Sequence, residues 1–513
     1  MRQLSEHDAA YIYSDSAHAN SNVTLLHIYD QSTAPGGMVR FKQILAHIES
    51  RLGRMPIFRQ KILRVPLDID YPYWIEDENF DIEYHVRHIA LPKPGDWRQF
   101  CIQAARIHAR PLDLQRPLWE MYVIEGLDSF LDLPVGSFAV LLKIHHAAID
   151  VAHHNEITAL LHDISPDSPP PTPPEPWFPE AAPGNLNLMV RAGFNVATFP
   201  LRMAQPLTRS WSTLKSAART FVGEFLGRPH EFPMTRFNTE VSPHRVFETR
   251  RFALKDFKAI RRLTPGATVN DAVLAVCAGG LRRYLDRQAE LPDDSLVAAA
   301  PIAVRATGKH AGKNSGDDGP ASFAWVRLAL GTDIADPVER LAAIQATSSS
   351  SDIVAQAISA RELVDLAEHA PSAAIAATSK MLRSASALLG DWVPLANCAI
   401  ANVPGPQVPL YLQGARLTYL SAIMPISDGM GLVFSVTSYN DMMIISFTAC
   451  YEQLPDPQVF AQCLRDSFQE YLALVRPAAR RKGRASAAKA ARRTTVATPK
   501  TLRRKPAPRA AAH

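Results

Sequence analysis

A run of prolines divides this chain into two parts and limits the ways in which it can fold. Nine prolines lie between Pro166 and Pro183. Proline fixes φ and lacks a backbone donor, so such a run favours neither a helix nor the interior of a sheet. We therefore expect an extended linker there, with a folded unit on either side of it in the 513-residue chain.

Strand-like and helix-like patterns alternate on both sides of the linker. Short apolar, β-branched runs predict strands, and longer amphipathic stretches predict helices. The alternation predicts an α/β fold. The predicted strands are 136–144, 326–331, 431–439 and 442–451, and the predicted helices are 153–162, 269–288 and 460–475.

We accordingly expect four segments. Residues 1–162 and 245–475 are the two folded units, residues 163–244 are the linker and a connector, and residues 476–513 are a disordered tail. Within the connector, residues 185–223 combine many apolar residues with five basic residues and no acidic residue. Such a stretch can lie as a helix on an anionic bilayer, or it can pack on the body as a simple connector.

The net charge of +5 comes from the tail alone. The tail holds 13 Lys and Arg and no acidic residue, and the rest of the chain has 42 basic against 50 acidic residues, a net charge of −8. Three roles are open for the tail: contact with anionic lipid, nonspecific binding of nucleic acid by counter-ion release, or solubility.

The N-terminus and the cysteines favour a cytoplasmic protein. The first 15 residues are polar and resemble no signal peptide, and no run of about 18 apolar residues predicts a membrane span. The five cysteines are not closely spaced, which suits neither a disulfide framework nor a zinc site. Any contact with membrane is therefore expected to be peripheral.

The most informative chemistry lies in KIHHAAID, residues 143–150, where two histidines follow a predicted strand. Neutral imidazole is the usual base for taking a proton from an alcohol near neutral pH. Asp150 follows His146 by four residues and can fix its tautomer or its loop. The residues alone leave two alternatives open. They can be structural, or HHAAIDVAHH can bind metal, since His153 and His154 bring the potential ligands to five.

Six blocks resemble, in order, the bacterial wax ester synthase/diacylglycerol acyltransferase family. HHAAID matches the first six positions of the family's HHxxxDG motif, and the similarity extends over roughly residues 1–475. Several blocks in one order are far more specific than HHxxxD alone. The other blocks are LSEHDAAYIY (4–13), FDIEYHVRHIALPKPG (80–95), PLDLQRPLWEMYVIEGL (111–127), TVNDAVLAV (268–276) and ANVPGPQVPLYLQGARL (401–417).

The resemblance implies a two-domain CoA-dependent acyltransferase fold of the chloramphenicol acetyltransferase type. Mixed sheets flanked by helices would enclose a tunnel between the domains. Acyl-CoA would be a substrate and no cofactor would be needed. The acceptor would be diacylglycerol or a long-chain alcohol, giving triacylglycerol or wax ester. His146 would act as general base for direct attack on the thioester, which agrees with the absence of a G-x-S-x-G nucleophile motif.

The resemblance also assigns the remaining site residues. Taken from the residues alone, Thr268 is a helix cap, Asn402 and Gly405 form a tight turn, and the PLW block is core packing. No metal ligands are assigned. The catalytic set is His146, His145, Asp150 and Asn270, and the substrate-binding set is Pro117, Leu118, Trp119, Val151 and Asp271.

One departure from the family pattern keeps a second function open. Val151 stands where the motif has glycine, and glycine permits closer backbone approach than valine does. Valine can narrow the pocket or shift Asp150. The alternative is therefore a catalytically weak member that acts as a lipid-binding or regulatory protein. For an active member, we expect a cytoplasmic enzyme at the inner membrane or at lipid inclusions.

Overall fold

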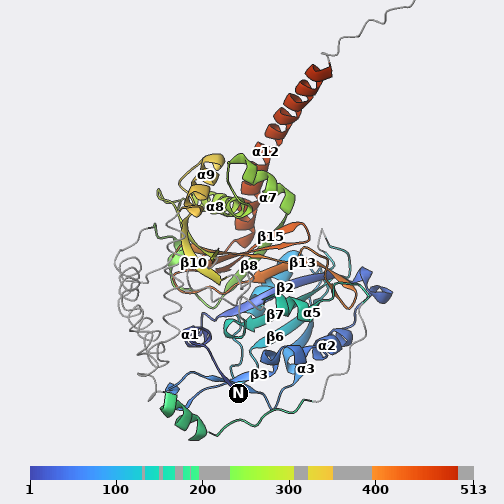
Figure 1. Ribbon diagram of the computed structural model, residues 1–513, viewed down its shortest axis with the longest axis vertical. Coiled ribbons are helices and arrows are strands. Elements are labelled where there is room, and N and C mark those ends of the chain that lie inside the picture. Colours follow the sequence, from blue (N-terminus) through green and yellow to red (C-terminus); the bar gives the residue numbers. More distant parts are fainter. Residues whose placement is uncertain are drawn as a thin grey trace, which may run out of the picture.

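A computed structural model gives the fold of the chain. It describes residues 1–129, 133–149, 154–167, 177–184, 186–195, 232–304, 322–350 and 396–494. Within these residues, two six-stranded sheets and one three-stranded sheet are flanked by helices (Figure 1). The predicted α/β fold with two mixed sheets is confirmed.

The first large sheet has the order β12-β13-β2-β7-β6-β5. Its centre is antiparallel, and only the edge strand β5 runs parallel to its neighbour β6. Helix α4 packs apolar side chains against one face, and helices α2 and α5 lie on the other (Figure 1). The elements are β2 (Asn22–Asp30), β5 (Val86–Ala90), β6 (Trp119–Glu125), β7 (Phe138–His145), β12 (Tyr411–Leu412), β13 (Ala415–Ile423), α2 (Phe41–Glu49), α4 (Trp97–Ala109) and α5 (His154–Leu161).

The second large sheet has the order β10-β9-β11-β14-β15-β8. Its helices gather on one face and bury a core rich in aliphatic and phenylalanine side chains (Figure 1). The three strands and two helices predicted in this part are confirmed, and most of their ends agree within three residues, whereas α12 continues well beyond residue 475. The elements are β8 (Arg245–Ala253), β9 (Val297–Val304), β10 (Ser322–Ala329), β11 (Cys398–Pro404), β14 (Leu432–Tyr439), β15 (Met442–Cys450), α7 (Leu254–Ile260), α8 (Val269–Arg287), α9 (Pro337–Ser348) and α12 (Pro457–Thr494).

A small sheet and two short helices complete the first half. Strands β1 (Arg2–Gln3), β4 (Tyr73–Glu76) and β3 (Gln60–Leu63) form that sheet. Helix α1 (Glu6–Ser14) begins at Ser5, whose hydroxyl accepts a hydrogen bond from the Asp8 amide. Helix α3 (Ile82–His85) leads directly into β5.

One strand pair crosses the predicted boundary between the two units. We expected residues 245–475 to form the second unit by themselves, but β12 and β13 belong to the first sheet. There, β13 pairs antiparallel with β2, with Leu420 opposite His27. Without β13, strand β2 would be an edge with unpaired backbone groups, and the returning chain covers that edge.

The tail and the connector also differ from expectation in part. Helix α12 continues through Thr494 and extends away from the body (Figure 1). Ala, Lys and Arg dominate this stretch and are strong helix formers, which accounts for a helix where disorder was expected. In the connector, residues 186–195 are helical, and Leu188 and Ala192 are buried against the small sheet. The rest of residues 185–223, most of the proline run and residues 495–513 lie outside the described residues.

A buried histidine holds the crossing strands to the first half. The side chain of Gln413, between β12 and β13, donates to His47 Nδ1 at 2.7 Å, and His47 Nε2 donates to the Leu161 carbonyl at 3.0 Å. These partners fix the neutral form of the ring. Burial, with the charge of Arg51 nearby, lowers the pKa of His47 to about 4.

This contact predicts a loss of stability in mild acid. Because the folded-state pKa of His47 lies below the unfolded value of about 6.5, the unfolded chain binds the proton first as the pH falls. We expect the free energy of unfolding to decrease between about pH 6.5 and pH 4, and His47→Gln to remove part of that decrease. Urea denaturation at pH 7 and pH 4.5 measures it, with the exposed His244→Gln as control. An unchanged pH dependence in His47→Gln would contradict the assignment.

Candidate active site

The two adjacent histidines lie at the C-terminal end of β7, which is a central strand of the first sheet. Backbone hydrogen bonds fix this turn from both sides. The His145 amide donates to the Leu118 carbonyl at 3.0 Å, and the His146 amide donates to the Ser21 carbonyl at 2.8 Å. Residues 146–148 then form one turn of 3₁₀ helix. The turn is therefore held by the residue that precedes β6 and by the segment that leads into β2.

His145 is built into the fold. Its side chain is buried, Nδ1 accepts a hydrogen bond from the Ala147 amide at 3.1 Å, and Nε2 lies 3.0 Å from the Asp15 carboxylate. Because Nδ1 accepts, the ring proton is on Nε2 and points at Asp15. Both nitrogens are thus engaged, which favours a positioning role for His145 over proton transfer with a substrate.

His146 is the more accessible of the two histidines. It is only partly buried, and its ring stacks on Tyr11 of α1 with centroids 4.0 Å apart and planes 16° apart. Burial raises the pKa of Tyr11 to about 12, so the phenol stays neutral beside the imidazole. The stacking restricts the rotation of the His146 ring. Among the predicted residues, His146 is best placed for a general base.

Sequence reasoning missed the residues that support this turn. Tyr11, Asp15 and Ser21 all come from the first 21 residues, more than 120 positions before the histidines. Only the block LSEHDAAYIY, residues 4–13, pointed to this region, and it did not single out Tyr11.

The PLW block, residues 117–119, packs beside the histidine turn. Pro117, Leu118 and Trp119 are all buried. The Trp119 indole donates to the Phe58 carbonyl at 2.8 Å and stacks on His85, with centroids 4.6 Å apart. These contacts agree with core packing, the interpretation taken from the residues alone. The substrate-binding role that the resemblance implied stays a prediction.

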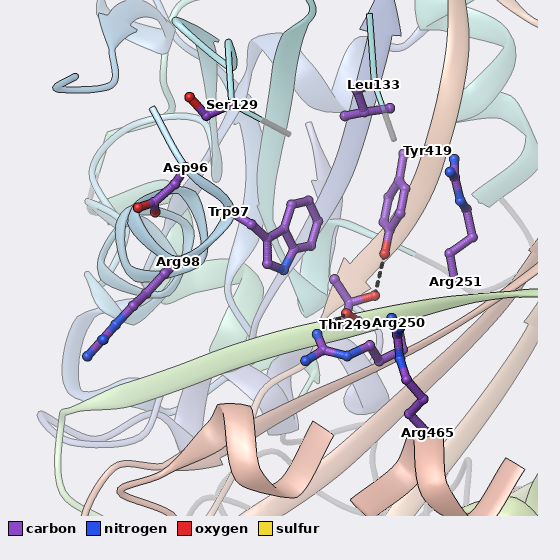
Figure 2. Close-up of a pocket in the computed structure, with 10 residues that line it drawn as sticks. All are labelled: Asp96, Trp97, Arg98, Ser129, Leu133, Thr249, Arg250, Arg251, Tyr419 and Arg465. Atoms are coloured by element: carbon purple, nitrogen blue, oxygen red, sulfur yellow. Dashed lines mark hydrogen bonds between the residues drawn. The ribbon is translucent and has the colours of Figure 1, made fainter. Parts of the chain in front are cut away.

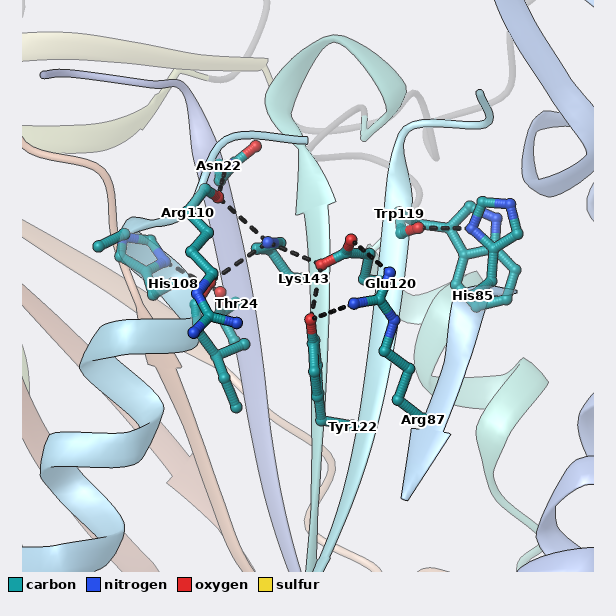
Figure 3. A network of polar contacts seen from close by, with 12 residues as sticks. Asn22, Thr24, His85, Arg87, His108, Arg110, Trp119, Glu120, Tyr122 and Lys143 are labelled. Atoms are coloured by element: carbon teal, nitrogen blue, oxygen red, sulfur yellow. Dashed lines mark hydrogen bonds and ion pairs between the residues drawn. The ribbon is translucent and has the colours of Figure 1, made fainter. Parts of the chain in front are cut away.

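A fully buried lysine lies two residues before His145 (Figure 3). Lys143 Nζ is 2.9 Å from Glu120 Oε2 and donates to the carbonyls of Ile107 and Arg110 at 3.2 and 3.1 Å. All three ammonium protons therefore have acceptors. These bonds tie β7 to β6 and to the C-terminal end of α4, directly beside the histidine turn.

The carboxylate of this pair is held by further partners. Tyr122 donates to Glu120 at 3.0 Å and Arg87 lies 3.3 Å from it (Figure 3). Burial alone would raise the pKa of Glu120, but the charge and hydrogen bond of Lys143 lower it below its usual value. Burial lowers the pKa of Lys143, and Glu120 opposes that shift. Lys143 and Glu120 thus form an ion pair in which each residue stabilises the charged form of the other.

The start of α8 contains the next two predicted residues. Thr268 caps the helix as expected, since its hydroxyl accepts a hydrogen bond from the Asp271 amide at 3.1 Å. Asp271 is buried: one carboxylate oxygen accepts from the Thr268 amide and hydroxyl, and the other accepts from Ser348 at 2.7 Å. Both oxygens are engaged within the fold, which favours a capping role for Asp271 over contact with a substrate.

Asn270 has a partner that the sequence pattern misplaced. Asn402 was expected in a tight turn, but it lies within β11, opposite Val436 of β14. Its amide donates to the Asn270 carbonyl oxygen at 2.9 Å. Gly405 lies just beyond the end of β11 and donates its amide to the Ser438 carbonyl at 2.9 Å, and a side chain there would meet that carbonyl at 2.5 Å. The expected turn is therefore wrong for Asn402, which supports Asn270 from β11.

The structure does not describe the side chains of the remaining predicted residues. Asp150, Val151 and His153 lie outside the described residues, and His154 begins α5 without a described side chain. Among the residues that are described, no group of three or more His, Cys, Asp or Glu side chains is arranged to hold a metal ion. The metal alternative for HHAAIDVAHH stays untested, because part of that stretch is not described.

Comparisons with known proteins cover both halves of the chain. The family model for the wax ester synthase/diacylglycerol acyltransferase catalytic domain matches residues 4–273, and the model for the C-terminal domain of the same family matches residues 321–471. Two relatives from Mycobacterium tuberculosis, each provisionally named a diacylglycerol O-acyltransferase, are 31% and 30% identical. The first match covers 92% of this chain and 90% of the relative, and the second covers 93% and 98%.

Solved structures share the fold. The wax ester synthase/diacylglycerol acyltransferase from Marinobacter aquaeolei is 24% identical, with a TM-score of 0.63 over 92% of this chain and 99% of that one. The starter condensation domain of rhizomide synthetase, solved with C8-CoA, is 13% identical, with a TM-score of 0.50 over 92% and 94%. The expected two-domain acyltransferase fold is thereby confirmed.

The buried pair beside the turn predicts a large and specific effect of one substitution. Lys143→Met removes the cation and leaves Glu120 buried without it, so we expect a loss of about 3–5 kcal/mol in the free energy of unfolding. Adding Glu120→Gln should restore part of that loss, because the uncompensated charge is gone. Denaturant unfolding of the single and double variants measures the coupling.

The control is the more exposed pair of Arg283 and Glu470, 3.1 Å apart on α8 and α12. Arg283→Met should cost at most about 1 kcal/mol, as is typical of such pairs. An equal loss in Lys143→Met and Arg283→Met would show that the buried pair is not a structural tie.

Proposed function

Because the chain belongs to the wax ester synthase/diacylglycerol acyltransferase family, we propose that it moves a long-chain acyl group from acyl-CoA to the hydroxyl of diacylglycerol or of a long-chain alcohol. The observation that carries the proposal is the catalytic-domain match over residues 4–273, which contains the His146 turn. The comparisons give no support to the alternative of a lipid-binding member without turnover. The products are triacylglycerol or wax ester, and acyl-CoA is the donor with no further cofactor.

In the proposed reaction His146 is the general base. Its ring takes the proton of the acceptor hydroxyl as that oxygen attacks the thioester carbonyl carbon. The tetrahedral intermediate collapses with cleavage of the carbon–sulfur bond, and the imidazolium returns its proton to the departing thiolate of CoA. The stack on Tyr11 and the bond from the His146 amide to Ser21 support this role, because they hold the ring in one orientation.

Asn270, Asp150 and Val151 complete the proposed site. Asn402 occupies the Asn270 carbonyl oxygen, so the Asn270 amide group can donate to the oxyanion of the intermediate. Asp150 would orient His146 or its turn. Val151, in place of the motif glycine, would narrow the acceptor side of the pocket and bias the choice of alcohol.

Replacing His146 tests the mechanism. We expect His146→Ala to lower turnover by ~10²–10⁴-fold, the usual contribution of acid–base catalysis. His145→Ala is the neighbouring comparison and should cost less turnover but more stability, because His145 is buried and engaged on both nitrogens. The assay follows labelled acyl-CoA into product lipid with a panel of diacylglycerols and alcohols. A folded His146→Ala protein with near-full activity would refute the role.

From the nature of the substrates we also propose that the reaction takes place at a lipid surface. The acceptors and products partition into lipid, yet no helix in the described part of the chain is long and apolar enough to cross a membrane. The body has a net charge of −8, whereas the tail from Arg476 onward adds 13 basic residues and no acidic residue. A basic segment close to anionic lipid is attracted by ~1 kcal/mol per Lys or Arg, and salt screens that attraction.

Truncation after Val475 tests the tail as a tether. We expect the full chain to bind anionic vesicles weakly and in a salt-sensitive way, and the truncated chain to bind less while keeping its turnover on dispersed substrates. Co-sedimentation with vesicles at low and high salt measures this, and neutral vesicles are the control. Equal sedimentation of the two proteins would exclude the tether and favour a solubilising or nucleic-acid role.

A further inference from the structure

A cavity of about 400 Å³ lies where helices α4 and α12 meet strands β8 and β13 (Figure 2). Elements from both halves of the chain therefore contribute to it. Its volume falls in the range of small-molecule sites. The residues used below are Trp97 of α4, Thr249, Arg250 and Arg251 of β8, Tyr419 of β13 and Arg465 of α12.

The lining is strongly basic. It includes four arginines and a single carboxylate, Asp96, which caps α4 by accepting from the Gln99 amide at 2.8 Å. Arg250 and Arg465 reach one side of the cavity from two different elements, whereas Arg98 points away (Figure 2). Bringing like charges to one cavity is unfavourable unless an anion neutralises them.

Among the described residues, one carboxylate, Glu248, contacts Arg250, and none contacts Arg465. Arg250 contacts Glu248 at 2.8 Å, but the same Glu248 oxygen also accepts from the Trp97 indole at 2.6 Å. Arg250 also donates to the Thr249 carbonyl at 2.9 Å, and its Nε is buried out of reach of a ligand. Arg465 makes no ion pair or hydrogen bond with any residue that the structure describes. Donors thus remain for an external acceptor.

Aromatic surface accompanies the cations. Trp97 and Tyr419 lie with ring centroids 5.7 Å apart, and the Tyr419 hydroxyl is 2.7 Å from the Thr249 hydroxyl. Burial raises the pKa of Tyr419, so it adds no negative charge. An arginine cluster beside aromatic rings suits a ligand with phosphate groups next to a planar body, because guanidinium pairs with phosphate through two parallel hydrogen bonds.

We propose that this cavity recognises the phosphate groups of a nucleotide-sized ligand. In the reaction proposed above, on which this assignment of the ligand rests, the molecule with that chemistry is the donor: CoA carries a phosphorylated adenosine diphosphate at the end remote from its thioester. An anionic phospholipid headgroup is the other source of the same phosphate chemistry.

The position of the cavity suits the remote end of the donor. Helix α4 starts at Trp97 beside the cavity, and the carbonyls of Ile107 and Arg110 at its far end bind Lys143, next to the histidine turn. At 1.5 Å per residue, its 13 residues span about 20 Å. Contacts so far from the reacting atoms are the same in the ground state and the transition state, so their loss should raise KM and leave kcat nearly unchanged.

The test measures binding directly, with the full chain and with 3′,5′-ADP, CoA and phosphate-free pantetheine as probes in isothermal titration calorimetry. We expect 3′,5′-ADP and CoA to bind, and Arg465→Gln and Arg250→Gln each to weaken both by roughly 10-fold or more, as for a lost hydrogen bond to a charged group. The matched control is Arg262→Gln, an exposed arginine outside the cavity. Thermal denaturation shows whether Arg250→Gln, which loses its contact with Glu248, stays folded. Arg465→Gln breaks no described contact.

The outcomes separate the site from the reaction. Equal affinity in Arg465→Gln, folded Arg250→Gln and Arg262→Gln would overturn the site. Arginine-dependent binding of 3′,5′-ADP by a chain that lacks turnover would uphold the site and refute the proposed function. If vesicles containing phosphatidate bind in an Arg465-dependent way while 3′,5′-ADP does not bind, phosphate recognition stands and CoA is overturned as its source.

Discussion

The pairing of β13 with β2 is the contact on which the arrangement of the whole chain depends. It takes a strand from the second half into the first sheet, and the same strand also bonds to the second sheet, for example between Ser421 and Ser446 at 2.7 Å. Loss of this pairing would expose an edge of β2 and remove one of the connections between the two sheets. Because β2 starts directly after Ser21, which holds the His146 amide, the crossing strand also fixes the frame of the site.

Next to the histidine turn, the ion pair of Lys143 and Glu120 is buried where an apolar side chain would need no partner. Lys143 lies in a strand whose other side chains are almost all apolar, and its ammonium is satisfied by Glu120 and two helix carbonyls. Buried pairs of this kind contribute little net stability compared with apolar packing, but they specify one geometry, because any shift leaves a charge without partners. Because Lys143 lies two residues before His145, the pair fixes the geometry of the strand end that carries the two histidines.

The adjacent histidines illustrate how neighbouring residues divide their tasks. Successive residues at a strand end point to opposite sides. His145 therefore enters the interior, where Asp15 and the Ala147 amide occupy its nitrogens, while His146 remains partly exposed against Tyr11. One histidine is thus engaged within the fold, and the other is the proposed base. The same division separates Asp271, which is engaged in capping, from its neighbour Asn270.

The sequence by itself determined the local elements and the family. Apolar runs gave β7, β14 and β15, the capping residue Thr268 marked the start of α8, and ordered motif blocks pointed to the acyltransferase fold and to His146. These features are encoded within a few neighbouring residues or in matched blocks. What only the tertiary structure decided was long-range pairing: β13 crossing into the first sheet, Asn402 lying in a strand beside Asn270, and Tyr11 stacking on His146. Local periodicity carries no information about such partners, since residues more than a hundred positions apart meet only when the chain is packed.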